Sequence, residues 1–322
     1  MKQLLKKVLD GNTLTFEESL IAMDSTYAPL DELIRVAEII TLRNFRSELE
    51  VCAIHAAKVG KCSANCAFCA QSSYHKSNIS VLNPKDIDSD TVVSYALSLQ
   101  KNGVSRFSLV TSGEFLTEHE FEQVLCLYCK LRAETNLKMC ASLGILNESR
   151  AKLLVENGIT RYHHNLETSQ SYFPNICSTH SYNDKLETIH IARKAGMEIC
   201  SGGIISMGET AQQRVEMAYA LRELDVDSIP INILNPIVGT RLENQVLLSV
   251  DEILRTIAVF RMILPNKTLR FAGGRQNAMG LMEYWGYKSG INALMTGNFL
   301  TTNGTTVEEE IENLKARNYF IK

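Results

Sequence analysis

The sequence predicts an α/β fold: a closed parallel (β/α)8 barrel of the TIM type with a helical extension at its N-terminus. Two observations support this fold class. Short β-branched or apolar runs recur eight times, and a segment with helical periodicity follows each of them. No Pro- or Gly-rich linker divides the 322 residues into halves, so one large core is expected. A doubly wound open sheet is the main alternative, because it is built from the same alternation.

The candidate strands alternate with the candidate helices along the chain. They lie at residues 50–57, 106–111, 137–143, 160–167, 197–205, 227–234, 268–272 and 291–296. In a barrel of this type the catalytic groups stand at the C-terminal ends of the strands. Functional side chains are therefore expected in the segments that follow the strands.

The helices between these strands carry boundary signals at both ends. Glycines mark three helix ends, in the sequences around Gly103, Gly158 and Gly196, where a strand begins directly afterwards. Capping boxes are predicted where Thr or Ser precedes Glu or Gln by three residues: Thr117 with Glu120, Thr210 with Gln213, Ser249 with Glu252, and Thr306 with Glu309.

Residues 1–48 are predicted to be a helical extension that plugs or flanks the barrel, and the barrel takes residues 49–322. The extension is expected to hold two amphipathic helices. Thr15 and Glu18 cap the first helix. The second carries an apolar face made of Leu33, Ile34, Ala37 and Ile40.

Composition and charge exclude several function classes. A net charge of −3 and a pI near 6.2 give no reason to expect a nucleic-acid partner or an anionic membrane surface. No run of eighteen apolar residues predicts a membrane span, and the N-terminus lacks the apolar core of a signal peptide. Nine cysteines without a secretory signal favour a reducing cytoplasm and a metal or redox use of the thiols.

Cys62, Cys66 and Cys69 form a C-x3-C-x2-C pattern in the segment that follows the first predicted strand. Three thiolates on one loop hold a cubane iron–sulfur cluster by three of its irons and leave the fourth iron open to a small molecule, whereas four cysteines would close the cluster. Zinc ribbons use paired C-x2-C knuckles, and no second knuckle is suitably placed here. The alternative is a chance grouping of three cysteines.

The remaining cysteines include a second close pair, Cys126 and Cys129. Both fall on a predicted helix over residues 118–134, far from the expected mouth of the barrel. They are interpreted as packing or incidental residues, with a metal site as the alternative. Cys177 has no partner that the sequence identifies.

The cysteine pattern resembles that of the radical S-adenosylmethionine enzymes, and further motifs in matching order resemble the biotin synthase family within them. The resemblance covers the chain from about Leu33 to Thr302. It rests on residues 162–169 (YHHNLETS), 200–204 (CSGGI), 229–232 (IPIN), 270–275 (RFAGGR) and 300–302 (LTT).

The resemblance implies an enzyme that inserts sulfur into dethiobiotin to form biotin, a sulfurtransferase. In that family the three cysteines bind a 4Fe-4S cluster and S-adenosylmethionine chelates its open iron. One electron from a flavodoxin or ferredoxin then generates a 5′-deoxyadenosyl radical. The radical takes hydrogen atoms from dethiobiotin, and a second cluster supplies the sulfur. A homodimer is also implied, with no nucleic-acid or membrane partner.

The resemblance assigns five residues to the S-adenosylmethionine site. Phe68 matches the aromatic position before the third cysteine. Asn165 matches an asparagine between dethiobiotin and the ribose, and Glu167 stands where the family has an aspartate for the ribose. Lys185 stands where an arginine is expected, and Ile204 is expected to pack against the adenine.

Three further residues are implied in binding dethiobiotin. Asn232 matches an asparagine that hydrogen-bonds the ureido ring, a task that suits an amide because it offers both a donor and an acceptor. Thr301 and Thr302 match the pair that receives the substrate carboxylate. His163 stands where the family has an asparagine, and a buried structural histidine is the alternative interpretation of it.

The ligand set of the auxiliary cluster departs from the 2Fe-2S pattern of the family. Cys140, Cys200 and Arg270 match three of its positions, and Cys200 and Arg270 are the expected catalytic residues. Ser108 stands where the remaining cysteine is expected, and serine is a poor ligand for iron in such clusters. The hypothesis is an altered cluster in which Cys52, on the first strand, supplies the missing thiolate. The number of irons stays open, and a small buried hydrophobic role for Cys52 is the alternative.

Two other functions compete with this one. The first is another radical enzyme of the same barrel subgroup, similar to a hydrogenase-maturation protein or an amino-acid mutase, which would not need Cys140, Cys200 and Arg270 together. The second is a non-catalytic binding protein that a metal stabilises.

Overall fold

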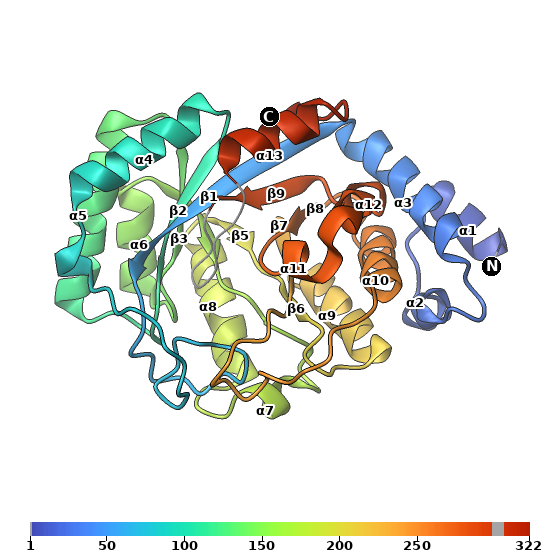
Figure 1. Cartoon of the computed structure of the whole chain (residues 1–322), viewed down its shortest axis with the longest axis horizontal. Helices are drawn as coiled ribbons and strands as arrows, with labels where there is room; N and C mark the ends of the chain where they lie inside the picture. Colours follow the sequence, from blue (N-terminus) through green and yellow to red (C-terminus); the bar gives the residue numbers. More distant parts are fainter. Residues whose placement is uncertain (1, 298–305) are drawn as a thin grey trace.

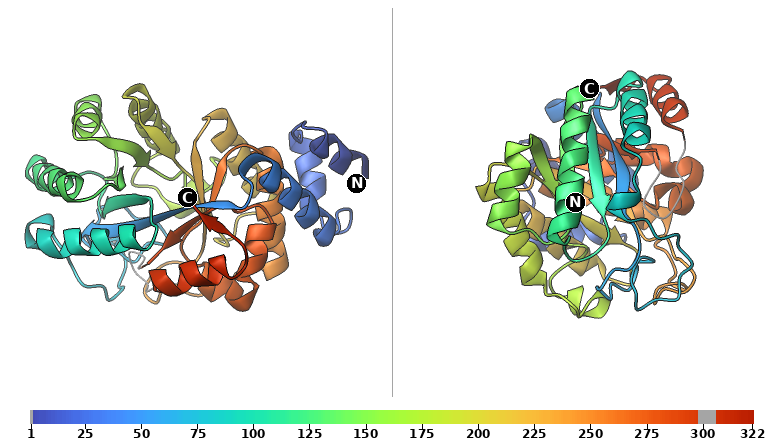
Figure 2. Two further views of the ribbon diagram at one scale, coloured as in Figure 1. Left: turned by 90° about the horizontal axis from the view of Figure 1, so that it is seen from above. Right: turned by 90° about the vertical axis from the view of Figure 1, so that its left-hand side faces the viewer.

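A computed structural model describes residues 2–297 and 306–322, and in it the parallel strands form a closed ring. The strands follow the order β1-β2-β3-β4-β5-β7-β8-β9, and β9 pairs back to β1. Every one of these pairings is parallel, and helices cover the outside of the ring (Figures 1 and 2). The predicted barrel is therefore confirmed, and the open sheet is excluded.

The strands agree with the predicted segments to within a few residues at most positions. Their bounds are β1 Glu48–Lys58, β2 Arg106–Thr111, β3 Lys138–Ser142, β4 Ile159–His163, β5 Glu198–Cys200, β6 Gly203–Ile205, β7 Ser228–Ile233, β8 Thr268–Phe271, β9 Ala293–Thr296 and β10 Phe320–Ile321. The short β10 pairs with the start of β1.

The helices fill the connections between the strands. Their bounds are α1 Lys2–Leu9, α2 Phe16–Met23, α3 Leu30–Phe45, α4 Ser89–Lys101, α5 Glu118–Glu134, α6 Glu148–Glu156, α7 Phe173–Ile176, α8 Tyr182–Lys194, α9 Ala211–Glu223, α10 Val250–Ile263, α11 Arg275–Met279, α12 Tyr284–Lys288 and α13 Val307–Lys315, with 3-10 turns at Pro84–Asp86 and Gly280–Glu283. No helix in this described part of the chain is long and apolar enough to cross a membrane.

Two predicted strands are interrupted at the mouth of the barrel. The prediction for residues 160–167 was too long, because β4 ends at His163 and Glu167 has a φ of +71°. The prediction for residues 197–205 was wrong in its middle, because the chain breaks into β5 and β6 around Gly202. A Cβ at Gly202 would lie 2.0 Å from the carbonyl oxygen of Pro230, so β7 approaches this break more closely than a side chain allows.

The predicted helix boundaries are largely confirmed. Gly103, Gly158 and Gly196 have φ values of +90°, +76° and +95°, as helix-ending glycines require. Capping boxes close at Thr15, Thr117 and Thr210. Ser249 and Thr306 accept the amide of the third residue of their helices, but no reciprocal bond closes a box at either of these described residues. At Ser249 the reason is that the carboxylate of Glu252 pairs with Arg214 instead.

The N-terminal extension contains three helices where two were predicted: α2 and α3 are the predicted pair, and α1 precedes them. The extension flanks the barrel: α2 packs on α9 and α10, and α3 packs along α10 (Figure 1). Leu33, Ala37 and Ile40 are buried in this interface. The α10 residue Arg255 donates to the carbonyl oxygens of Ala22 and Ala28 at 3.0 and 2.7 Å, which satisfies backbone groups at the end of α2.

Candidate active site

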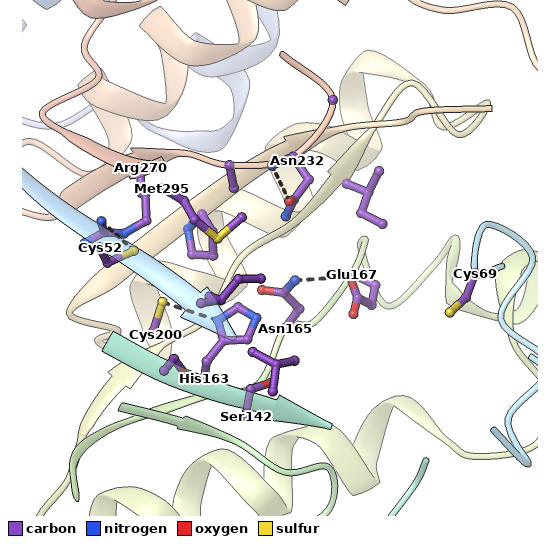
Figure 3. A pocket seen from close by; sticks show the side chains of 18 of the residues that line it. Cys52, Cys69, Ser142, His163, Asn165, Glu167, Cys200, Asn232, Arg270 and Met295 are labelled. Carbon is purple, nitrogen blue, oxygen red and sulfur yellow. Dashed lines mark hydrogen bonds between the residues drawn. The ribbon is translucent and has the colours of Figure 1, made fainter. Parts of the chain in front are cut away.

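A cavity of about 390 Å³ occupies the barrel interior and opens at the C-terminal ends of the strands. Every strand of the ring contributes to its wall, which is where a barrel of this type places its chemistry. Twelve of the residues singled out in the sequence line it: Cys52, Phe68, Cys69, Ser108, Cys140, His163, Asn165, Glu167, Cys200, Ile204, Asn232 and Arg270. In Figure 3, Cys69 lies at one end of the labelled side chains and Cys52, Cys200 and Arg270 lie at the other.

The cysteine loop leaves β1 at Lys58 and folds back on itself at the cavity mouth. The amide of Cys62 donates to the carbonyl oxygen of Gln71 at 3.1 Å, and the amide of Cys69 donates to that of Cys66 at 3.0 Å. These bonds gather the three cysteines on one short turn. All three are free thiols, so the donor set fits an iron–sulfur cluster with three protein ligands.

Asn165 and Glu167 extend past the end of β4 into the cavity. The side chain of Asn165 donates to Glu167 at 3.3 Å and accepts the amide of Gly202 at 3.1 Å. The backbone of Glu167 pairs with the segment after β5, since its amide donates to Gly202 and its carbonyl oxygen accepts from Ile204. One carboxylate oxygen of Glu167 accepts from Asn165, and the other oxygen can receive a hydroxyl group from a bound molecule.

Asn232 faces the cavity from β7. Its side-chain nitrogen donates to the carbonyl oxygen of Gly203 at 3.2 Å, and its side-chain oxygen accepts the amide of Gly273 at 2.9 Å. These two bonds orient the amide between the neighbouring strands. Asn232 therefore has a fixed orientation before any ligand binds.

The inner end of the cavity contains Cys52, Cys140, Cys200 and Arg270. Arg270 donates to the sulfur of Cys52 at 3.1 Å and to the carbonyl oxygen of Leu294 at 2.9 Å. Burial raises the pKa of all three thiols, to about 11 for Cys140, and the nearby arginines oppose that effect. The group is a set of buried soft ligands beside a cation, which suits an anionic iron–sulfur cluster.

Ser108 lies next to Cys140 across the β2–β3 pairing and also lines the cavity. Its hydroxyl makes one long bond of 3.3 Å to the carbonyl oxygen of Leu109. Cys52 faces the same cavity from β1, where its neighbours across the pairing are Arg106 on one side and Met295 on the other. Cys52 therefore points into the cavity, as a ligand of a cluster there must.

A charged network beneath the thiols was missed by the sequence analysis. Glu50 accepts from Arg106 at 2.9 Å, from Arg161 at 2.8 Å, and from Arg270. Glu198 accepts from Arg106 and Arg161 at 2.8 Å each. Burial alone would raise the pKa of Glu50, but the three arginines hold it well below its usual range.

This network leaves three guanidinium groups facing two carboxylates, so the cavity floor carries a formal charge of +1. Strand alternation could have indicated the arginines of this network. Arg106 is two residues before Ser108, and Arg161 is two residues before His163, so each shares the inward face of its strand.

His163 and His164 are both partly buried, with different surroundings. His163 lines the cavity, and its Nδ1 lies 3.3 Å from the sulfur of Cys200. Burial lowers the pKa of His163 to about 4, so the ring is neutral at pH 7 and places no second cation beside Arg270. His164 faces away from the cavity, and burial lowers its pKa as well.

Several expected site residues lie elsewhere. Lys185 is buried on α8 with its ammonium 5.8 Å from the ring centre of Phe173, and it is absent from the described residues that line the cavity. Thr301 and Thr302 lie outside the described residues. Cys126 and Cys129 are exposed on α5, and in the described chain they join no group of metal-ligating atoms.

The family comparisons divide the chain into two matched segments. Residues 58–221 match the radical SAM superfamily, and residues 230–320 match the biotin and thiamin synthesis associated domain. The barrel with a cysteine loop after its first strand therefore defines a radical S-adenosylmethionine enzyme.

Curated relatives specify the family more narrowly. A biotin synthase from Caldicellulosiruptor bescii is 45% identical over 98% of this chain and 94% of its own length. A biotin synthase from Acetivibrio thermocellus is 46% identical over 96% of this chain and 95% of its own length. The chain belongs to the biotin synthase family.

Solved structures share the fold at low sequence identity. A methylornithine synthase (PylB) superposes with a TM-score of 0.83 over 99% of this chain and 97% of its own, at 16% identity. The FeFe-hydrogenase maturase HydG from Carboxydothermus hydrogenoformans gives a TM-score of 0.85 over 100% of this chain and 79% of its own, at 15% identity. These likenesses bear on the barrel architecture.

Proposed function

We propose that this enzyme converts dethiobiotin to biotin by radical sulfur insertion. The observation that carries the proposal is the single cavity that joins the cysteine loop at the mouth to a second set of thiols at the floor. A substrate bound between them would meet the radical source on one side and a sulfur source on the other. Family membership agrees with this arrangement.

In this proposal Cys62, Cys66 and Cys69 hold a 4Fe-4S cluster whose open iron takes S-adenosylmethionine. When bound, that cluster supplies the electron that cleaves the sulfonium. Electrons would come from a flavodoxin or a ferredoxin. The chain's own contribution is to position the reactants and to exclude water.

The residues around the middle of the cavity divide the binding tasks. Phe68 and Ile204 would pack against the adenosyl group, and the carboxylate of Glu167 would accept the ribose hydroxyls. Asn165 lies between this half and the substrate half, and Asn232 would bind the ureido ring. Lys185 and the pair Thr301 and Thr302 stay predictions for the two carboxylates.

We infer that Cys52, Cys140 and Cys200, with Arg270 as ligand or close neighbour, hold the auxiliary cluster. Support comes from the three thiols on one cavity floor, and from the 3.1 Å contact of Arg270 with the sulfur of Cys52. The +1 charge beneath them favours an anionic cluster over separate thiols. In this proposal Cys200 and Arg270 are the catalytic residues, because they hold the cluster that would supply the sulfur.

The test of the activity is an anaerobic assay of the reconstituted protein with S-adenosylmethionine, dethiobiotin and dithionite. Biotin and 5′-deoxyadenosine are expected together, both measured by mass spectrometry. Formation of 5′-deoxyadenosine without biotin would favour another radical enzyme of this barrel type, and formation of neither would favour a non-catalytic protein.

The auxiliary ligand set is tested by iron and sulfide analysis of Cys52→Ala, with Cys126→Ala as the matched control. Cys126 is exposed on α5, so its loss removes a thiol without touching the cavity. The Cys52 variant is expected to keep the first cluster and lose iron and sulfide of the second. Retention of both clusters with full turnover would overturn the assignment.

The homodimer, the cytoplasmic location and the physiological electron donor stay predictions. Sedimentation analysis of the reconstituted protein measures the first.

A further inference from the structure

Cys177, to which the sequence analysis assigned no partner, lies against the cysteine loop. Its sulfur is 3.8 Å from the sulfur of Cys66 and 3.4 Å from Nδ1 of His180. The three ligand atoms all lie within 4.8 Å of one another. Cys177 is buried, and neither it nor His180 lines the substrate cavity.

Hydrogen bonds hold the two segments of this group together. The amide of Ala67 donates to the carbonyl oxygen of Ile176 at 2.8 Å, and the amide of Ser178 donates to the side chain of Asn65 at 2.9 Å. Arg241 donates to the carbonyl oxygens of Asn65 and Ile176 at 3.2 and 2.8 Å. The approach of Cys66 to Cys177 is therefore fixed on both flanks, although 111 residues separate them in sequence.

The spacing of the ligand atoms matches that of a tetrahedral zinc site. With bonds of about 2.3 Å to sulfur and about 2.0 Å to nitrogen, tetrahedral angles place two sulfurs about 3.8 Å apart and a sulfur and a nitrogen about 3.5 Å apart. Two of the three observed separations match these values: 3.8 Å between the sulfurs of Cys66 and Cys177, and 3.4 Å between the sulfur of Cys177 and Nδ1 of His180. The third, between Cys66 and His180, lies within 4.8 Å, so a small shift of these side chains would complete the geometry.

The chemistry of the group agrees with its geometry. Two thiolates and a neutral imidazole neutralise a divalent cation, so burial of the complex leaves no net charge to desolvate. The C-x2-H spacing of Cys177 and His180 puts two ligands on one short turn at the end of α7. A water molecule would complete the tetrahedron and keep the complex neutral, whereas the carboxylate of Glu114, 3.9 Å from Nδ1 of His180, would add one negative charge.

We propose that Cys66, Cys177 and His180 form a binding site for one thiophilic divalent cation of the Zn²⁺ class, and that the chain uses this site when its 4Fe-4S cluster is absent. Cys66 cannot ligate both at once, so the cation-loaded state and the cluster-loaded state exclude each other. The mutual exclusion of cation and cluster rests on the proposed role of Cys66 as a cluster ligand. The cation site itself does not depend on that role.

The site is tested first on the full chain carrying Cys62→Ala and Cys69→Ala, which removes the other two cysteines of the loop. Anaerobic titration with Co²⁺ is expected to give one equivalent with tetrahedral ligand-field bands and thiolate-to-cobalt charge transfer. Zn²⁺ is expected to displace it, because zinc binds such ligands more tightly than cobalt.

Adding Cys177→Ala to this background should weaken Co²⁺ binding by more than about 100-fold, beyond the loss expected for an outer-shell partner. Adding Cys126→Ala instead should change nothing, and His180→Gln should remove the imidazole contribution from the spectrum. Equal binding with and without Cys177, or a spectrum without tetrahedral bands, would overturn the site.

The exclusion is tested on the chain with all its cysteines. The cluster-loaded protein is expected to take up no Co²⁺ with this spectrum, and one equivalent of Zn²⁺ is expected to slow cluster reconstitution of the cluster-free protein. Uptake of Co²⁺ by the cluster-loaded protein would refute the exclusion. The cobalt titration uses neither S-adenosylmethionine nor dethiobiotin, so its failure is distinguishable from a failure to form biotin.

Discussion

Neutralising Glu50 is expected to destabilise the barrel through the charged network at the cavity floor. In Glu50→Gln, Arg106 and Arg161 would keep only Glu198, and Arg270 would lose its ion pair with Glu50. The formal charge of the floor would rise from +1 to +2. Removing one partner of a buried ion pair costs about 3–5 kcal/mol, because the remaining charge is left without compensation.

The assay is equilibrium urea unfolding of the cluster-free chain under reductant at pH 7. With a dependence of about 3 kcal/mol per molar urea, the midpoint should fall by about 1 M or more. Glu148→Gln is the control, since Glu148 pairs with Lys194 at an exposed surface and its loss should leave the midpoint unchanged. If the urea midpoint of Glu50→Gln equals that of Glu148→Gln, the charged network does not stabilise the fold.

The pH dependence has a definite sign. The pKa of Glu50 is lowered in the folded chain, so its contribution to the free energy of unfolding is present above the unfolded pKa of about 4.3. That contribution is lost as the pH falls from about 4.3 toward the folded pKa, because the unfolded chain then takes up a proton that the folded chain does not. The difference in the free energy of unfolding between the parent chain and Glu50→Gln should therefore become smaller toward low pH.

Three other substitutions probe the fold and the site. Gly202→Ala should lower the free energy of unfolding by about 3 kcal/mol or more, because its Cβ would lie 2.0 Å from the oxygen of Pro230; an unchanged urea midpoint would contradict that packing. Thr117→Ala removes the capping box of α5 and should cost about 1 kcal/mol in the same assay, against no change for Cys126→Ala. Asn165→Ala should raise the KM for S-adenosylmethionine about tenfold, and an unaltered KM would argue against its place between the two ligands.

The two sets of cysteines, in the loop and at the cavity floor, differ in how far the sequence could predict them. The loop of Cys62, Cys66 and Cys69 is local, so its spacing alone indicates a shared metal site. Cys52, Cys140 and Cys200 lie on three strands, and only the inward face of each strand brings them to one cavity floor. Ser108 shows why resemblance is insufficient there: it keeps its place beside Cys140 but offers no thiol.

Strand alternation accounts for part of the rest of the site. Applied to residues 160–167, it puts His163, Asn165 and Glu167 on one face, and all three line the cavity even though β4 itself ends at His163. It could also have indicated Arg106 and Arg161, whose charges on an inward face require partners. What it could not indicate was that both would share Glu50, because that pairing spans three strands.

The sequence by itself determined the barrel, the helix boundaries and the cluster-binding loop, because each is written in periodicity, capping residues or short spacing. The additional N-terminal helix, α1, packs against α3. The break between β5 and β6 was decided by tertiary packing, because β7 approaches at Pro230. The contact of Cys177 with Cys66 was decided in the same way. These two residues are 111 positions apart in sequence and meet only because the segment after β4 packs against the cysteine loop. No local sequence pattern predicts that contact.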